Sequence, residues 1–285
     1  LGIILPPSLI LVIYGATQDV SVGRLFLAGF APGLFLAVAF MIYIAIRAKL
    51  KPDWLPEVST PPSWPQTFSA LVGLWPIAIL MMAVLGTIYL GVATPTEAAA
   101  LGAFATVVMG FVFGTLTLKR LMRALINSIV SFGAIALIMV GAAMLTQVIS
   151  ILGLPMQLTA AVADLEMGKY AIFLAVVIIY IVLGCFFDGL SVMLMTLPLT
   201  FPMMMAAGFD PVWYGIAVTI LIEIGMITPP VGINLFVLSA ISKGDVSVAE
   251  AARETLPYWI LMLVCLGVFT AFPEIITFLP NSIMN

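Results

Sequence analysis

The sequence predicts an all-α membrane protein with several spans, because its composition and hydropathy both depart from those of a soluble domain. Of its 285 residues, 64% are apolar and 8% are charged, whereas soluble domains are about 45–50% apolar and about 25% charged. The mean hydropathy is +1.27. Such a chain has too few charged side chains to cover a water-soluble globule. We therefore expect a lipid bilayer around most of its surface.

The composition also excludes several functions. A net charge of -3 and ten basic residues without an extended basic patch argue against nucleic-acid binding. The sequence has no histidine, which rules out His-based catalytic triads, His-ligated metals and His proton relays. Cys185 and Cys265 both lie in apolar runs, so a disulfide framework is not expected.

The apolar runs mark the expected spans, each of which needs about 20 residues. Residues 4–18 are too short to cross and contain Pro6 and Pro7. The segment 47–70 contains charges and five prolines and is expected to be a loop. Thr94, Pro95 and Glu97 form the pattern that begins a helix. A short surface segment is expected from 153 to 169. The expected spans are 24–46, 71–91, 95–116, 124–150 and 255–278.

Residues 170–207 predict a re-entrant hairpin. Two short apolar halves flank a polar, glycine-containing tip that runs from Gly184 to Ser191. Two half-length helices around such a tip are typical of re-entrant segments, and one long kinked span is the alternative. Residues 212–241 are also interrupted, at Gly225-Met226-Ile227-Thr228-Pro229-Pro230, and predict a broken helix.

The basic residues set the expected orientation. With loop 47–70 on the cytoplasmic side, eight of the ten basic residues fall on that side, in agreement with the positive-inside rule. This holds only if 170–207 enters and leaves on one face, which favours the hairpin. The eight are Arg47, Lys49, Lys51, Lys119, Arg120, Arg123, Lys243 and Arg253.

The sequence contains an internal repeat. Gly2-Ile3-Ile4-Leu5-Pro6-Pro7 matches the interruption at 225–230, and Asp19-Val20-Ser21-Val22 matches Asp245-Val246-Ser247-Val248. The expected orientation places the second pair of blocks on opposite sides, so the repeats are inverted. Residues 1–46 would end one repeat and 71–285 form the other, with scaffold helices at 71–150. Inverted repeats with interrupted helices are typical of secondary transporters.

The interruptions predict a cation site. Pro229 and Pro230 have no N–H, so carbonyls upstream lose their helical partners, and Pro6 marks the equivalent break. The carbonyls of Gly225 and Thr228, with the Thr228 hydroxyl, are neutral oxygen ligands that suit Na⁺. The half-helix after Pro230 presents a positive N-terminus that favours an anion. A simple proline kink is the alternative.

Three acidic residues lie at or near membrane depth, where carboxylates are functional candidates. Glu97 is explained by helix capping, whereas Asp188 at the hairpin tip is a candidate for binding substrate or orienting the loop. Glu223 precedes the second break and is expected to support it. No basic residue lies beside the breaks, so an anion would need helix N-termini, bound cations and uncharged groups. The candidates for these groups are Ser8, Ser191 and Asn234.

The chain resembles the large membrane subunit of TRAP transporters (tripartite ATP-independent periplasmic transporters, DctM type) over essentially its whole length. The resemblance rests on four stretches: 2–8 with 13–15, Gly29-Phe30-Ala31-Pro32-Gly33, Ala93-Thr94-Pro95-Thr96-Glu97-Ala98-Ala99 and Ile227-Thr228-Pro229-Pro230-Val231-Gly232. It implies an elevator-type, sodium-coupled importer of carboxylates, by default a C4-dicarboxylate, with no enzyme activity and no cofactor or metal besides sodium.

The resemblance also implies partners and ligands. The partners would be a small membrane subunit (DctQ type) and a periplasmic substrate-binding protein (DctP type), at the bacterial inner membrane. One sodium site would use Gly184 with Gly225, Thr228 and Val231. The other would use Gly2, Leu5 and Pro7 with a hairpin from an N-terminal half that this sequence lacks, so we expect a fragment. A sodium/divalent-anion symporter without a binding protein is the first alternative, and a membrane enzyme or structural subunit the second.

Overall fold

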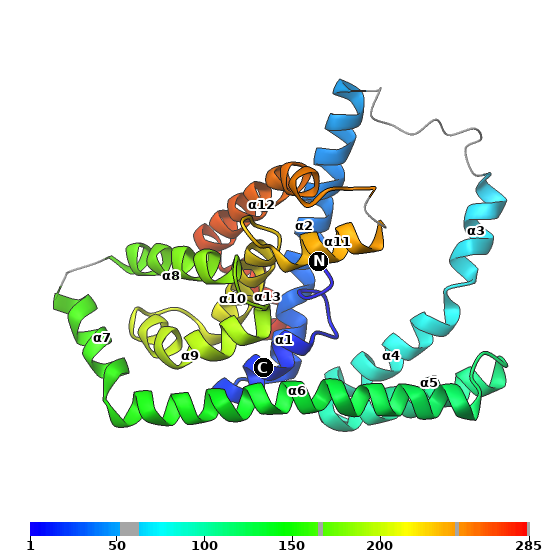
Figure 1. Ribbon diagram of the computed structural model, residues 1–285, viewed down its shortest axis with the longest axis horizontal. Coiled ribbons are helices and arrows are strands. Elements are labelled where there is room, and N and C mark those ends of the chain that lie inside the picture. Colours follow the sequence, from blue (N-terminus) through cyan, green and yellow to red (C-terminus); the bar gives the residue numbers. More distant parts are fainter. Residues whose placement is uncertain (52–62, 165–167, 243–244, 284–285) are drawn as a thin grey trace. The chain divides into compact units, whose positions relative to one another are not determined.

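A computed structural model describes residues 1–51, 63–164, 168–242 and 245–283, and these residues form thirteen helices and no strand (Figure 1). The helices are α1 (Leu9–Gln18), α2 (Val22–Leu50), α3 (Trp64–Val72), α4 (Trp75–Tyr89), α5 (Pro95–Val112), α6 (Leu118–Ile151), α7 (Leu154–Asp164), α8 (Lys169–Gly184), α9 (Gly189–Ala206), α10 (Pro211–Met226), α11 (Ile233–Ile241), α12 (Val248–Ala271) and α13 (Glu274–Ile283).

Five of these helices, α2, α5, α6, α9 and α12, are long and apolar enough to cross a membrane. The pair α3 and α4, which is bent by 44°, would make a sixth span. The predicted class, an all-α polytopic membrane protein, is confirmed.

The predicted loop 47–70 is partly helical at both ends, while residues 52–62 lie outside the described residues. Helix α2 continues through Arg47 and Lys49, whose positive charges favour the negative C-terminal end of a helix. Helix α3 begins at Trp64, because Ser63 and Gln66 form a capping box around Pro65. The predicted span 71–91 is accordingly the bent pair α3 and α4.

One further predicted segment contains a helix, and one predicted span was wrong. The surface segment after 153 is largely the helix α7, and residues 165–167 lie outside the described part of the chain. The predicted last span, 255–278, is two helices. Ser247 caps α12 early by accepting a hydrogen bond from the Glu250 N–H, and α12 ends before Pro273, which has no N–H to continue it.

The chain divides into two compact units, residues 1–40 with 135–285 and residues 41–134. In the larger unit, α10 is the central helix and packs against α1, α8, α9, α11, α12 and α13. Its Trp213 indole donates to the Phe269 carbonyl on α12 (3.0 Å), and the Tyr14 hydroxyl on α1 donates to the Pro211 carbonyl (2.7 Å). Nearly every α10 side chain from Val212 to Ile224 is buried.

Helices α8 and α9 pack against each other as the two arms of a hairpin (Figure 1). The Thr196 hydroxyl on α9 donates to the Tyr180 hydroxyl on α8 at 2.7 Å, and both side chains are buried. Residues 169–206 are therefore a hairpin and not one long kinked helix.

The repeated sequence blocks have matching local structure. Each break is followed by a short helix, α1 or α11, and then by a longer one, α2 or α12. Ser21 accepts a hydrogen bond from the Arg24 N–H at 3.4 Å, as Ser247 does from the Glu250 N–H at 3.2 Å. The two matched serines thus begin two equivalent helices.

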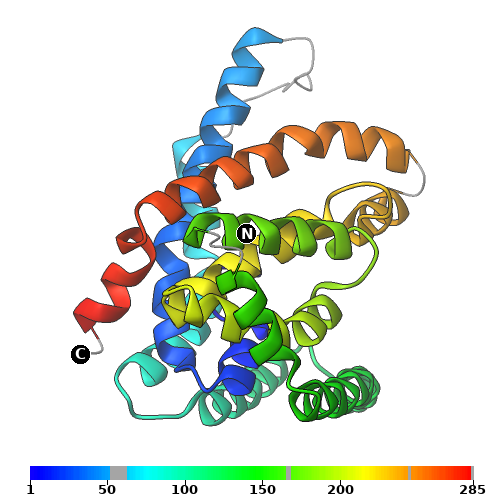
Figure 2. The same ribbon diagram turned by 90° about the vertical axis from the view of Figure 1, so that its left-hand side faces the viewer.

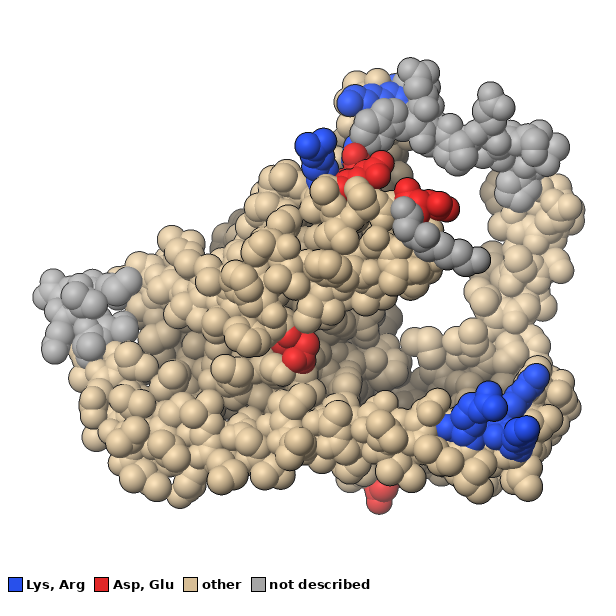
Figure 3. Space-filling model, in the orientation of Figure 1, with Lys and Arg blue, Asp and Glu red and all other residues tan. Residues whose placement is uncertain are grey.

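In the smaller unit, α4 packs against α5, where Leu85, Ile88 and Ala98 are buried. Most of its other apolar side chains are exposed, as expected for helices that face lipid. Lys and Arg side chains gather over the start of α6 and near the end of α2, while most of the visible face carries no charge (Figure 3).

Candidate cation and substrate site

The hairpin tip and the second break meet through two glycines without side chains between them. A Cβ atom built on Gly184 would lie 2.8 Å from the Gly225 Cα, a distance that real Cβ atoms essentially never show. The close approach therefore brings together the end of α8 and the end of α10. Gly184 and Gly225, predicted to share one site, are adjacent in the structure.

Two further contacts fix the tip against the break. The Gly232 N–H donates to the Cys185 carbonyl at 3.2 Å, and the Cys185 thiol donates to the Pro229 carbonyl at 3.3 Å. Gly232 has a φ of +56°, in the left-handed region that favours glycine. The loop at 227–232 is thus attached to the tip at Pro229 and at Gly232.

Carbonyl groups without backbone partners lie around this contact. Within the described residues, the carbonyls of Gly184, Thr228 and Val231 accept no backbone hydrogen bond. The prediction that the Gly225 carbonyl is also free was wrong. The chain turns after Met226, and the Thr228 N–H donates a hydrogen bond to the Gly225 carbonyl at 3.1 Å. The Thr228 hydroxyl donates to the Ile224 carbonyl at 2.5 Å, which leaves its oxygen lone pairs available.

Helix ends give this region a definite electrostatic character. Helices α8 and α10 both end here, and their C-terminal carbonyls carry partial negative charge that favours a cation. Helix α11 begins here after Gly232 with no side-chain cap, so its first N–H groups are available to an anion. Asn234 lies in this first turn and makes no side-chain hydrogen bond within the described residues.

Asp188 and Ser191 are joined by hydrogen bonds at the start of α9. The Asp188 carboxylate accepts hydrogen bonds from the N–H groups of Leu190 and Ser191, both at 3.1 Å, and from the Ser191 hydroxyl. Asp188 is therefore the N-cap of α9. Of the two predicted roles, the structure supports orientation of the loop. The cap uses α9 N–H groups that an anion would otherwise have met.

The first break is held by α2. A Cβ on Gly29 would lie 2.4 Å from the Ile4 carbonyl oxygen, so the segment before α1 lies directly on the α2 backbone. Ser8 is buried and caps α1 by accepting from the Leu11 N–H at 3.4 Å. No hydrogen bond joins this break to the hairpin tip within the described residues. Gly2, Leu5 and Pro7 therefore lie together on a segment that is not hydrogen-bonded to Gly184 or Cys185.

The other two acidic candidates have different surroundings. Glu97 caps α5, where its carboxylate accepts from the Thr94 N–H and hydroxyl at 2.8 Å each, so its expected capping role is confirmed. Glu223 lies on α10 with Oε2 buried and without a hydrogen-bond partner in the described residues. The Leu1 nitrogen is 3.9 Å from Glu223 Oε1, so this carboxylate lies beside both breaks.

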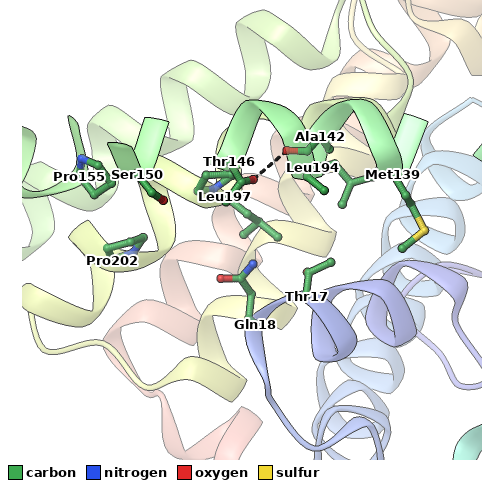
Figure 4. Close-up of a pocket in the computed structure, with 12 residues that line it drawn as sticks. Thr17, Gln18, Met139, Ala142, Thr146, Ser150, Pro155, Leu194, Leu197 and Pro202 are labelled. Atoms are coloured by element: carbon green, nitrogen blue, oxygen red, sulfur yellow. Dashed lines mark hydrogen bonds between the residues drawn. The ribbon is translucent and has the colours of Figure 1, made fainter. Parts of the chain in front are cut away.

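A cavity of about 460 Å³ lies away from these residues, between α1, α6 and α9 (Figure 4). Its polar groups come from Thr17, Gln18, Thr146 and Ser150, and the Gln18 amide projects into it from the end of α1. None of the predicted site residues lines it. The only sign of this cavity in the sequence is the polar pair Thr17 and Gln18, which ends the apolar helix α1.

Comparison with known proteins gives consistent matches. Residues 1–275 match the family model of the tripartite ATP-independent periplasmic transporter, DctM component. The chain is 36% identical to the C4-dicarboxylate TRAP transporter large permease protein DctM of Pseudomonas aeruginosa, over 99% of this chain and 65% of that protein. It is 30% identical to the sialic acid TRAP transporter permease protein SiaT of Haemophilus influenzae, over 100% of this chain and 46% of that protein.

A third relative widens the range of substrates. The ectoine TRAP transporter large permease protein TeaC of Halomonas elongata is 32% identical, over 98% of this chain and 64% of that protein. The chain thus spans two thirds or less of the length of these relatives. All three are named as transporter permeases, a role that is not enzymatic.

Proposed function

The chain belongs to the DctM family of tripartite ATP-independent periplasmic transporters, and we propose that it forms part of a sodium-coupled importer of carboxylates. The observation that carries the proposal is the contact between Gly184 and Gly225, around which unpaired carbonyls and two helix C-termini gather. Uncharged oxygen ligands at helix C-termini suit Na⁺. The carbonyls of Gly184, Thr228 and Val231 and the Thr228 hydroxyl would be its ligands.

The substrate would bind next to this ion. The uncapped start of α11 offers N–H groups, and the Asn234 side chain adds an amide. A carboxylate there would be stabilised by the helix dipole and by the nearby cation. A second cation at Gly2, Leu5 and Pro7 would require a further hairpin tip. We take a C4-dicarboxylate as the default substrate, although relatives of similar identity are named for sialic acid or ectoine.

The transport cycle would be of the elevator type at the bacterial inner membrane. The hairpin and the broken helix would move together, since Cys185, Pro229 and Gly232 already join them. A periplasmic substrate-binding protein of the DctP type and a small membrane subunit of the DctQ type would complete the transporter. The alternative is a symporter that needs no binding protein.

Uptake into proteoliposomes tests this proposal. The full-length permease would be reconstituted with its small subunit, and uptake of C4-dicarboxylates and sialic acid measured with and without an inward sodium gradient and the binding protein. We expect uptake to require both sodium and the binding protein. Uptake without the binding protein would favour the alternative symporter. An uptake rate that is the same with and without the sodium gradient would contradict the proposed cation site.

A further inference from the structure

An apolar groove runs along the outside of the larger unit between α8 and α12. Both helices pack on α10 and lie beside each other (Figures 1 and 2). The groove has a volume of about 660 Å³, and its lining carries no charged side chain. It is lined by Tyr170, Phe173, Leu174, Val177, Leu263, Leu266, Gly267, Thr270 and Ala271.

The two walls of the groove are aligned at one end. The centre of the Phe173 ring on α8 lies 5.1 Å from the centre of the Trp213 ring. The Trp213 indole donates a hydrogen bond to the Phe269 carbonyl near the end of α12. The beginning of α8 is therefore level with the end of α12. From there the lining extends to Val177 on one wall and Leu263 on the other, which is about 10 Å along each helix.

A cation and a polar aromatic residue lie at the aligned end. The Lys169 ammonium group lies 4.4 Å from the centre of the Phe209 ring and donates to the Gly208 carbonyl at 3.3 Å. No carboxylate pairs with Lys169 in the described part of the chain. Tyr170 is 62% exposed, as is usual for tyrosines at the level of lipid headgroups.

We propose that this groove binds an anionic phospholipid, with one acyl chain between α8 and α12 and the headgroup phosphate at Lys169. The groove opens on a face where Leu174, Ile178 and Val264 are all more than half exposed. In a membrane protein such a face meets hydrocarbon, which an acyl chain supplies. A lysine at a membrane surface attracts anionic headgroups. The shape of the groove and the charge at its end thus select the same ligand.

Gly267 offers a direct way to block the groove. A Cβ built on it meets no atom within 4 Å, so a side chain can start there without displacing a neighbour. Because Gly267 lines the groove, Gly267→Leu is expected to fill part of it. Gly133 on α6 also has nothing within 4 Å of an added Cβ and does not line the groove. Gly133→Leu is therefore the matched control. Lys169→Gln removes the charge and leaves the groove unchanged.

The test is photo-crosslinking of the full-length permease in nanodiscs. The probes are phosphatidylglycerol and phosphatidylcholine with the same diazirine-labelled acyl chain, and crosslinked peptides are identified by mass spectrometry. We expect phosphatidylglycerol to label 170–177 and 263–271. Gly267→Leu should lower that labelling strongly, while Gly133→Leu leaves it unchanged. Lys169→Gln should lower phosphatidylglycerol labelling by about fivefold, the effect of one basic residue at a membrane surface, and leave phosphatidylcholine labelling unchanged.

Three results would overturn the proposal. Labelling of these peptides that Gly267→Leu does not change would place the lipid elsewhere. Equal labelling by both lipids that is insensitive to Lys169→Gln would exclude recognition of the headgroup. Crosslinks from the groove to another polypeptide in place of lipid would identify it as a protein interface.

Discussion

Gly184 and Gly225 touch backbone to backbone, and the contact excludes a side chain in both directions. A Cβ on Gly184 would lie 2.8 Å from the Gly225 Cα, and one on Gly225 would lie 2.6 Å from the Gly184 Cα. Because the obstacles are backbone atoms, no change of rotamer relieves either clash. Any larger residue must move the hairpin tip away from the break.

Gly225→Ala should therefore reduce sodium-dependent uptake strongly. The added methyl group separates α8 from α10 and moves the carbonyls of the proposed cation site apart. Overpacking of this kind typically destabilises a protein by about 1–3 kcal/mol, so folded permease should still be obtained. Initial uptake rates at several sodium concentrations, with thermal unfolding of the purified protein, separate loss of function from loss of fold.

Gly141→Ala is the control for this change. Gly141 is also a helical glycine, and a Cβ on it meets nothing within 4 Å. Its uptake and unfolding temperature should match those of the unmodified protein. Normal sodium activation in Gly225→Ala would show that the close approach is not needed for coupling.

Thr228→Val should weaken activation by sodium more than recognition of substrate. Valine keeps the shape of threonine but removes the hydroxyl that donates to the Ile224 carbonyl and is available as a cation ligand. We expect the sodium concentration for half-maximal uptake to rise by about tenfold, the effect of losing about 1.4 kcal/mol of binding free energy. The apparent substrate affinity at saturating sodium should change little. Thr228→Ser retains the hydroxyl and should restore activation, and an unchanged sodium dependence in Thr228→Val would exclude this hydroxyl as a ligand.

Asp188→Ala should loosen the hairpin tip. It removes the acceptor of two backbone hydrogen bonds at the start of α9, and loss of an N-cap typically costs about 0.5–2 kcal/mol. Asp188→Asn retains a capping oxygen and should keep most of the stability and uptake. Thermal unfolding and uptake of both variants provide the test. If the two variants are equally inactive while both remain stable, the negative charge of Asp188 acts on the ion or substrate directly.

The order of helices was predictable from the sequence because long apolar runs and proline-glycine interruptions mark spans and breaks directly. The ends of helices that carry charges were not predictable from hydropathy. Arg47 and Lys49 resemble loop residues in a hydropathy pattern, but their positive charges are favourable in the last turn of α2. Pro273 likewise lies inside an apolar run that hydropathy alone treats as one span, and only the observed end of α12 separates the two helices.

The candidate site was predictable in its membership but not in its bonding. Spacing relative to Pro229 and Pro230 identified the segment around Thr228, and the family resemblance linked it to Gly184. That the Gly225 carbonyl accepts from the Thr228 N–H depends on how tightly the chain turns after Met226. The capping of α9 by Asp188 depends on a side-chain rotamer, which spacing does not determine.

Labelling of a cysteine at Ala206 tests the predicted orientation, in which the end of the hairpin faces the periplasm together with Asp210. Asp210 itself is unsuitable, because its carboxylate caps α10 through the N–H groups of Val212 and Trp213 at 2.8 and 2.9 Å. Ala206 is exposed at the end of α9. In a background with Cys185 and Cys265 replaced, an impermeant maleimide added to intact cells should label Ala206→Cys. Arg253→Cys, exposed on α12 and predicted to be cytoplasmic, should be labelled only after permeabilisation. The reverse pattern would show either that the orientation is inverted or that 169–206 crosses the membrane and does not enter and leave on one face. Labelling of both cysteines from outside would contradict a crossing of the membrane by residues 212–241.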